Sequence, residues 1–297
     1  MFFAVKLKKM IQASELILNP DGSIYHLNLK PENIANDIIF VGDQDRVEKV
    51  TAYFDSIEFS TQKREFKTQT GIYKGKRITV ISTGIGPDNI DIVLNELDAL
   101  VNIDFETRKI KDQLTTLTII RIGTSGSLQP NIPVDSVVMS EYAIGLDNML
   151  RSYCIDSVSI PEIEMAFIKQ TNWDVQKGKP SVIRSSEILK NQFDSSEIHK
   201  GFTATAGGFY GPQGRILRLD IHDSHLNQKM DQFEFEGIQI TNLEMETAAI
   251  YGLAALLGHR AISLNAIIAN RANGTFSNKP YETIDNLIRY TLEKLVQ

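Results

Sequence analysis

The stretch TLTIIRIGTSGS, residues 116–127, shows most clearly what kind of fold the chain forms. It begins as a near-continuous apolar run rich in β-branched residues and ends in glycine and small polar residues. Such runs are typical of strands in a sheet that is covered on both faces. Comparable strand patterns occur on either side of it, at 38–41 before Gly42, RITVIST (77–83), DSVVMSEYAIG (135–145) and RAISLNAIIANR (260–271).

Segments with apolar residues at helical spacing alternate with these strands. They are DRVEKVTAYF (45–54), NIDIVLNELDALVN (89–102), ETAAIYGLAALLGH (246–259) and YETIDNLIRYTLEKLV (281–296). This alternation predicts an α/β fold, a single domain with a central mixed β-sheet flanked by helices. We expect residues 1–35 to be an N-terminal extension, with a short helix near 7–18, and residues 36–297 to be the domain itself. The polar region 150–235 predicts loops with a few irregular helices.

Composition narrows the class of protein. A formal net charge of −6 argues against a nucleic-acid partner, which would require a basic face. Cys154 is the only cysteine, so an internal disulfide is impossible, and a reducing compartment is favoured. The chain shows neither a signal-peptide pattern nor an apolar run long enough to cross a membrane. We therefore expect a cytoplasmic protein without a membrane partner.

Three predicted strand ends are followed by glycine and polar residues: GDQDR (42–46), STGIGP (82–87) and RIGTSGS (121–127). In α/β sheets ligands bind beyond the carboxyl ends of strands, and glycines let backbone N–H groups approach an anion. Arg46 and Arg121 lie beside these turns. Arg121 interrupts an apolar run, so its charge requires either a carboxylate partner or an anionic ligand. The residue types alone leave both alternatives open.

Two further segments carry suitable chemistry. FYGPQGR (209–215) offers an aromatic ring at Phe209 and hydrogen-bonding groups at Gln213 and Arg215, which could recognise a planar heterocycle. NLEMET (242–247) places Glu244 and Glu246 at a predicted helix start. These carboxylates could stabilise the helix N-terminus or bind sugar hydroxyls.

Together these segments resemble the nucleoside phosphorylase family. GDQDRVEKV, KREF (63–66), STGIG, RIGTSG, FYGPQGR, EME and the final ANR (269–271) occur in the family's order, and the resemblance covers about 23 to the C-terminus. FYGPQGR is the most specific match, because it is similar to the family's pyrimidine-recognition loop. The resemblance implies phosphorolysis of uridine to uracil and ribose 1-phosphate.

The resemblance also implies a role for each matching residue. Phosphate would be held by Gly42, Arg46, Arg121 and Thr124, with Arg64 of KREF reaching in from a neighbouring subunit. Ribose would be bound by Glu244, Met245 and Glu246, with His26 of SIYHLNL reaching across from the neighbour. Uracil would be bound by Phe209, Gln213, Arg215 and Arg271. Arg121, Arg215 and Glu246 would be the catalytic residues among them.

Shared sites of this kind require at least a homodimer, onto which the N-terminal extension would pack. The segment 100–115 is longer than in compact bacterial members, which disfavours their hexameric assembly. No cofactor or metal is expected, since inorganic phosphate is a co-substrate. Glu65 resembles a residue that helps to hold a monovalent cation in some relatives, but Asn89 stands where those have serine, so no cation is predicted.

Three alternatives remain. A hydrolytic nucleosidase would use water in place of phosphate, and the arginines argue against it. A metal-dependent hydrolase could use the aspartates and histidines of DIHDSH, which are Asp220, His222, Asp223 and His225. This segment, however, lies in a polar stretch and does not follow a predicted strand that ends in glycine. A non-catalytic nucleoside-binding protein would have no need of phosphate, ribose and base residues together.

Overall fold

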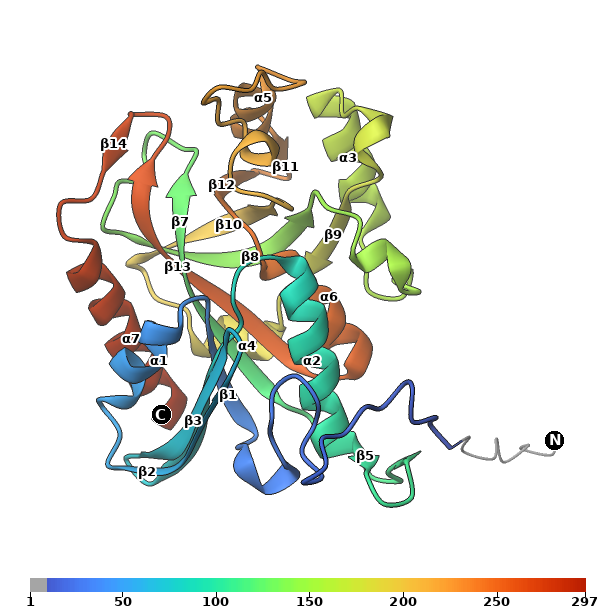
Figure 1. The fold of residues 1–297 in the computed structure, drawn as a ribbon. Coiled ribbons are helices and arrows are strands. Elements are labelled where there is room, and N and C mark those ends of the chain that lie inside the picture. Colours follow the sequence, from blue (N-terminus) through green and yellow to red (C-terminus); the bar gives the residue numbers. More distant parts are fainter. Residues whose placement is uncertain (1–9) are drawn as a thin grey trace.

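The computed structural model describes residues 10–297, and in this range the chain forms one large twisted sheet covered by helices (Figure 1). Helices α2 and α6 cover one face, while α1 and α7 cover the other (Figure 1). This arrangement confirms the predicted α/β class with a mixed central sheet. Its strands run in the order β11-β12-β10-β8-β13-β7-β1-β4-β3-β2, with β14 pairing with β13 and β9 with β8.

The first half of the sheet contains three of the predicted strands. Strand β1 (Asp37–Val41) lies parallel to both β4 (Lys76–Ser82) and β7 (Thr118–Ser127). The antiparallel strands β3 (Phe66–Tyr73) and β2 (Ser56–Lys63) extend this half to its edge. These two strands were not among those predicted from the sequence.

The second half of the sheet closes into a ring of five strands. Strand β7 pairs with β13 (Arg260–Asn270), β13 with β8 (Val137–Gly145), and β8 with β10 (Ile198–Thr205). Strand β10 then pairs with β12 (Ile238–Glu244), which returns to β7 through two residue pairs. The ring has an interior into which side chains from all five strands can point.

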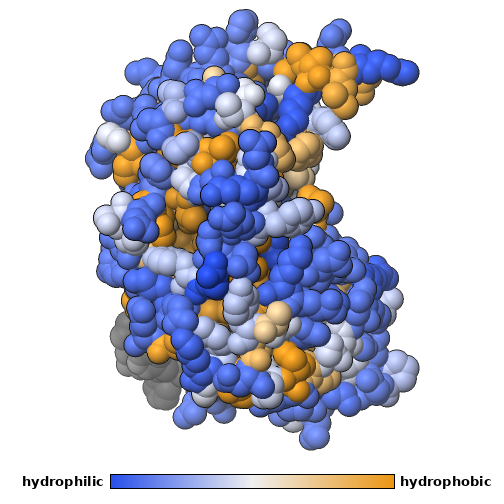
Figure 2. All heavy atoms as spheres, turned by 90° about the vertical axis from the view of Figure 1, so that its left-hand side faces the viewer, coloured by the Kyte–Doolittle hydropathy of each residue, from blue (hydrophilic) through white to orange (hydrophobic). Residues whose placement is uncertain are grey.

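The helices bury the two faces of this sheet in separate hydrophobic clusters. Helices α2 (Pro87–Asn102) and α6 (Thr247–Leu257) pack with the N-terminal segment on one face. Helices α1 (Gln44–Thr51), α4 (Glu187–Gln192) and α7 (Pro280–Val296) pack on the other. The outer surface on the side of α1, α7 and β14 (Thr275–Phe276) is mostly hydrophilic, with scattered hydrophobic patches (Figure 2).

The region 150–235 is more regular than its composition predicts. It contains α3 (Pro161–Thr171), β9 (Ser181–Arg184), α4, β10, and α5 (Leu226–Asp231), with 3₁₀ turns between them. The prediction of loops with a few irregular helices was therefore wrong for β9 and β10. The sequence of β10, IHKGFTAT, is not strongly apolar, but its small residues are buried inside the ring. Small elements also occur at β5 (Ile103–Asp104), β6 (Lys109–Ile110) and β11 (Glu234–Phe235).

The described part of the N-terminal extension, residues 10–35, packs on the face that carries α2. Leu16, Ile24, Leu27 and Leu29 are buried in the cluster on this face. The helix expected near 7–18 is wrong for residues 10–18, which form turns, and residues 7–9 lie outside the described range. None of the helices in residues 10–297 combines the length and the hydrophobicity that crossing a membrane would require.

Candidate functional site

A cavity of about 940 Å³ lies where β1, β4 and β7 present their carboxyl ends. Ten of the thirteen predicted site residues line it, although they come from widely separated parts of the chain. They are Gly42, Arg46, Arg121, Thr124, Phe209, Gln213, Arg215, Glu244, Met245 and Glu246.

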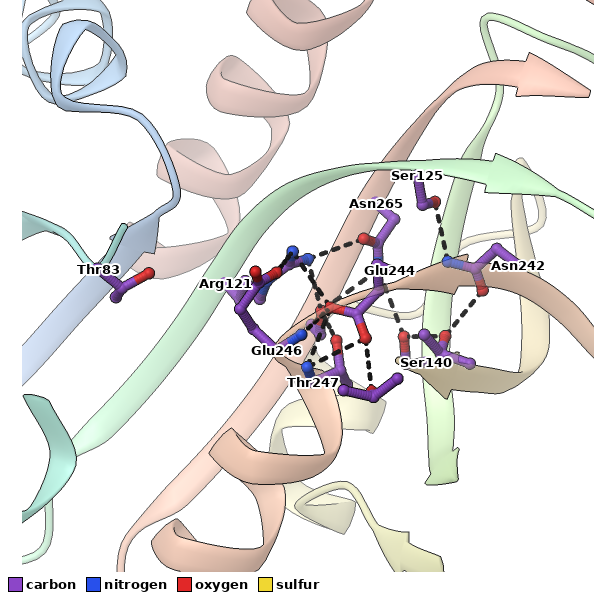
Figure 3. Close-up of polar contacts among 12 residues, drawn as sticks. Thr83, Arg121, Ser125, Ser140, Asn242, Glu244, Glu246, Thr247 and Asn265 are labelled. Atoms are coloured by element: carbon purple, nitrogen blue, oxygen red, sulfur yellow. Dashed lines mark hydrogen bonds and ion pairs between the residues drawn. The ribbon is translucent and has the colours of Figure 1, made fainter. Parts of the chain in front are cut away.

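Arg121 is buried and lines this cavity, and Figure 3 shows it beside Glu246 and Asn265. Its Nη2 lies 2.6 Å from Glu246 Oε2 and 3.2 Å from Glu244 Oε2. Burial would lower the pKa of Arg121, but the two carboxylates outweigh this effect and raise it. The sequence left a carboxylate partner and an anionic ligand as alternatives for Arg121. The structure shows the carboxylates, and the guanidinium still lines the cavity.

The two carboxylates differ in how much hydrogen-bonding capacity they retain. Glu244 accepts from the backbone N–H groups of Glu246 and Thr247 and from the Thr205 hydroxyl, so it caps the start of α6. Glu246 accepts one bond at each oxygen, from Gly86 N–H at 2.9 Å and from Arg121. Because a carboxylate has about four acceptor positions, Glu246 is the better candidate for further polar groups in the cavity.

Burial raises the pKa of Glu246, with Arg121 opposing this rise and Glu244 adding to it.

A second arginine, Arg46, lies close to Arg121. Arg46, at the start of α1, donates to the carbonyl oxygen of Ile122 at 3.3 Å. Burial and then the charge of Arg121 lower the pKa of Arg46. Two guanidinium groups that repel each other beside glycine-rich turns form an environment that favours an anion.

The loop that contains FYGPQGR forms another part of the cavity wall. The Arg215 guanidinium lies 3.8 Å from the centre of the Phe209 ring and donates to Gln213 Oε1 at 2.5 Å. Arg271 does not line the cavity, but its Nη1 donates to the Gln213 carbonyl at 2.7 Å. Burial and the nearby Arg215 lower the pKa of Arg271 to about 10. Aromatic, amide and guanidinium groups are thus assembled in one place.

Besides Arg271, two predicted residues do not line this cavity. Arg64 is exposed at the turn between β2 and β3, and His26 Nδ1 is 2.6 Å from Glu96 Oε1 on α2. Neither residue lines the cavity of its own chain. The prediction that they act in a neighbouring subunit remains a prediction.

The DIHDSH segment does not assemble a metal centre. His222 Nε2 lies 2.6 Å from Asp174 Oδ2, and Asp223 pairs with Lys229 at 2.9 Å. Across residues 10–297, no group of three or more histidine, cysteine, aspartate or glutamate side chains is placed to hold a metal ion. Asp220, His222 and Asp223 instead border a second cavity of about 770 Å³, which part of the FYGPQGR loop also lines.

The cavity also contains residues that the sequence interpretation missed, including Ser125, Ile268 and Phe276. Behind its wall lies Asn265, whose Oδ1 accepts from Arg121 Nη1 at 2.8 Å. Asn265 interrupts an apolar strand just as Arg121 does. A polar residue within a buried strand was the signal that could have identified it.

Gly123 leaves the space that Arg121 needs. A Cβ atom at this position would lie 1.8 Å from Arg121 Nη1, although the backbone of Gly123 has no left-handed conformation. Gly123→Ala should therefore displace the guanidinium and lower the free energy of unfolding by about 1–3 kcal/mol. Chemical denaturation measures this loss. Gly126→Ala on the same strand is the control, because its nearest contact, Arg271 Cδ, is at an ordinary 3.6 Å. Equal stability losses in the two variants would contradict the steric argument.

An α/β sheet whose strand ends enclose paired arginines, a partly free carboxylate and an aromatic loop defines an enzyme-like site for an anion and a polar organic molecule. The family model of the phosphorylase superfamily matches residues 37–293, and the chain belongs to this superfamily. This match confirms the resemblance drawn from the sequence and the expectation that the chain is an enzyme.

Individual relatives agree with this assignment. The chain is 29% identical over 257 residues to a uridine phosphorylase of Thermococcus kodakarensis, covering 86% of this chain and 80% of that protein. It is 24% identical over 275 residues to a DeoD-type purine nucleoside phosphorylase of Listeria monocytogenes, covering 92% and 99% of the two chains. A solved Trypanosoma brucei nucleoside phosphorylase, described as showing uridine phosphorylase activity, superposes with a TM-score of 0.85 at 29% identity, covering 95% and 99%.

Proposed function

We propose that this enzyme catalyses the reversible phosphorolysis of uridine to uracil and ribose 1-phosphate, as a step of pyrimidine salvage. The observation that carries the proposal is the contact between Arg121 and Glu246 in a cavity that also contains Arg46 and the FYGPQGR loop. The uridine phosphorylases among the relatives support the choice of nucleoside.

The residues that line the cavity include suitable ligands for both phosphate and ribose. Arg46, Arg121, the Gly42 backbone and Thr124 would hold phosphate beside the sugar. Glu246 would accept hydrogen bonds from the ribose hydroxyls, with Met245 against the sugar. Because Arg121 contacts Glu246, phosphate and ribose would be neighbours, as attack at C1′ requires.

The chemistry needs no covalent enzyme intermediate. A phosphate oxygen forms a bond to C1′ of the ribose while the bond from C1′ to N1 of uracil breaks. The electron pair of that bond passes to the uracil ring, which leaves as an anion and is then protonated at N1. Donors fixed near the growing negative charge stabilise this step. Arg215 and Gln213 would supply these donors, and Arg271 would support the loop through its bond to the Gln213 carbonyl.

A homodimer would complete each site. Arg64 at the exposed β2–β3 turn would add a cation to the phosphate position of a second copy, and His26 would approach its ribose. Neither residue serves the cavity of its own chain, which supports an intermolecular role. Residues 1–35 would form the extension that packs on the domain of 36–297 and on the partner.

Uracil release from uridine tests the proposal, measured in phosphate buffer and in a phosphate-free buffer, with inosine as the control substrate. We expect release from uridine only when phosphate is present, together with formation of ribose 1-phosphate. Release without phosphate would identify a hydrolytic nucleosidase. Phosphate-dependent cleavage of inosine but not of uridine would show that the base loop selects purines. No cleavage of either nucleoside would favour a binding protein.

A further inference from the structure

A chain of polar side chains runs around the interior of the five-stranded ring, and we call it the polar belt. It starts and ends on β7, which contributes two residues, and it takes one residue each from β13, β8, β10 and β12, in the order in which these strands pair. Figure 3 labels all of its members except the one on β10. The members of the polar belt are Arg121 on β7, Asn265 on β13, Ser140 on β8, Thr203 on β10, Asn242 on β12 and Ser125 on β7.

Each member contacts the next through its side chain. Arg121 Nη1 donates to Asn265 Oδ1 at 2.8 Å, and Asn265 Nδ2 donates to Ser140 Oγ at 3.4 Å. The Ser140 and Thr203 hydroxyls are 2.5 Å apart. Thr203 then donates to Asn242 Oδ1 at 2.8 Å, and the link that follows, from Asn242 Nδ2 to Ser125 Oγ, is 2.9 Å long.

Only the two ends of the polar belt, Arg121 and Ser125, line the candidate cavity. The four inner members have no exposed surface. Buried polar groups are costly unless they are hydrogen-bonded, so each inner member depends on its neighbours. The polar belt therefore ties the cavity ends to the rigid interior of the ring.

The orientation of Asn265 follows from the chemistry of its partner. An arginine has no acceptor, so the amide atom that faces Arg121 must be the oxygen. The amide nitrogen then points to Ser140 and, at 3.3 Å, to the Ser263 hydroxyl. The carbonyl oxygen of Asn265 is thus held toward Arg121 by bonds on its far side.

The Arg121 guanidinium has different partners at its two ends. Nη2 faces the carboxylates of Glu244 and Glu246, while Nη1 is held by Asn265 and approaches Ser263 Oγ at 3.4 Å. Two negative charges on one side pull the guanidinium toward them. Asn265 opposes this pull as a neutral acceptor on the other side, above the space that Gly123 leaves.

We propose that Asn265 is a positioning residue, which holds Arg121 in the direction needed to bind phosphate. The inference rests on the proposed function, in which Arg121 is a phosphate ligand. Without Asn265, Nη1 retains only the weak contact to Ser263, and the guanidinium turns toward its carboxylate partners. Phosphate binding then weakens, while the uridine contacts on the FYGPQGR loop are unaffected.

Asn265→Leu tests this role, because leucine has nearly the same shape and removes both polar atoms. We expect the KM for phosphate to rise about tenfold, the effect of one hydrogen bond to a charged group. The KM for uridine should stay within about twofold, since that loop keeps its contacts. Asn265→Ser is the second variant if the leucine variant does not fold, because serine is too short to reach Arg121.

Thr70→Val is the matched control. Thr70 is equally buried, and its hydroxyl bonds to the Asn33 carbonyl at 2.7 Å and to Thr79 at 2.8 Å, away from the cavity. Both variants should lose thermal stability, but only the Asn265 variant should lose phosphate affinity. An unchanged KM for phosphate in Asn265→Leu, or an equal rise in Thr70→Val, would overturn the proposal.

Thermal unfolding with and without inorganic phosphate gives a readout that does not need turnover. Phosphate should raise the Tm of the parent protein at concentrations about tenfold lower than those that raise the Tm of Asn265→Leu. If phosphate stabilises the parent at about tenfold lower concentrations than Asn265→Leu but no nucleoside is cleaved, the proposed reaction fails, while Arg121 remains a phosphate ligand that Asn265 positions. If phosphate neither stabilises the parent nor supports turnover, both proposals fail.

Discussion

Arg121→Ala should reduce phosphate-dependent uridine cleavage by about 10²–10³-fold, the typical cost of removing one fixed donor from an active site. It should also lower the free energy of unfolding by about 3–5 kcal/mol. The second effect arises because Glu244 and Glu246, which lie 3.2 and 2.6 Å from the guanidinium, lose their buried cation. Turnover and urea unfolding measure the two effects.

The loss of stability should depend on pH. Burial and the neighbouring carboxylate of Glu244 raise the pKa of Glu246, and Arg121 opposes that rise. In Arg121→Ala the folded pKa of Glu246 would therefore rise further, so the folded state would bind more protons than the unfolded state. The variant should be least stable at about pH 8 and recover part of its stability toward about pH 5.

The double variant Arg121→Ala, Glu246→Gln separates the two roles of the arginine. Removing one of the unpaired charges should restore part of the stability, and the coupling between the two sites should appear as non-additive unfolding energies. Phosphate-dependent turnover should remain low, because the proposed phosphate ligand Arg121 and the proposed ribose ligand Glu246 are both missing. Recovery of turnover with stability would mean that neither residue is a substrate ligand and that Arg121 is only a structural cation.

Arg121 shows how much of the site could be predicted from the sequence. Its place in an apolar run marked it as a residue that needs a partner. The identity of that partner could not be derived locally, because Glu246 lies 125 residues further along the chain. The sequence of its own strand gives no sign that removing Arg121 would destabilise the fold. The structure shows that Arg121 is the counter-ion of two buried carboxylates.

Some strands could not be predicted for a related reason, because their side chains have partners on other strands. Strands β1, β4, β7, β8 and β13 were predicted because they are continuous or largely apolar runs. Strand β10 was missed, since the interior of a closed ring accepts small polar side chains that bond to one another. Thr203 is buried through its bonds to Ser140 and Asn242, which lie on neighbouring strands. Periodicity within one segment cannot reveal such pairing.

Most of the site residues inferred from the family resemblance line the cavity, whereas Arg64 and His26 do not, and the fold explains this difference. Those that follow predicted strands, such as Gly42 and Thr124, meet in the cavity because strand ends of a parallel sheet meet at one edge. Arg64 and His26 belong to peripheral segments. Their positions in one chain therefore leave the proposed contact with a neighbouring subunit as a prediction.

Arg215→Ala should weaken the use of uridine far more than the binding of phosphate. We expect kcat/KM for uridine to fall by about 10²–10³-fold, because a pH-independent cation near the leaving base is removed. The KM for phosphate should change little, since the Arg215 guanidinium bonds within its own loop, to Phe209 and Gln213. The guanidinium groups of Arg46 and Arg121 bond to other partners. Steady-state kinetics with each substrate varied in turn measures both constants.

Arg218→Ala is the matched control for this variant. Arg218 carries the same charge three residues further along the same loop, but it borders only the second cavity. Its removal should leave both kinetic constants within about twofold of the parent, as is usual for a surface substitution. If Arg218→Ala has the larger effect on uridine, the base is recognised from the second cavity. If Arg215→Ala instead raises the KM for phosphate alone, each substrate binds where the other was proposed to bind, because a lost ligand weakens the binding of the substrate that it contacts.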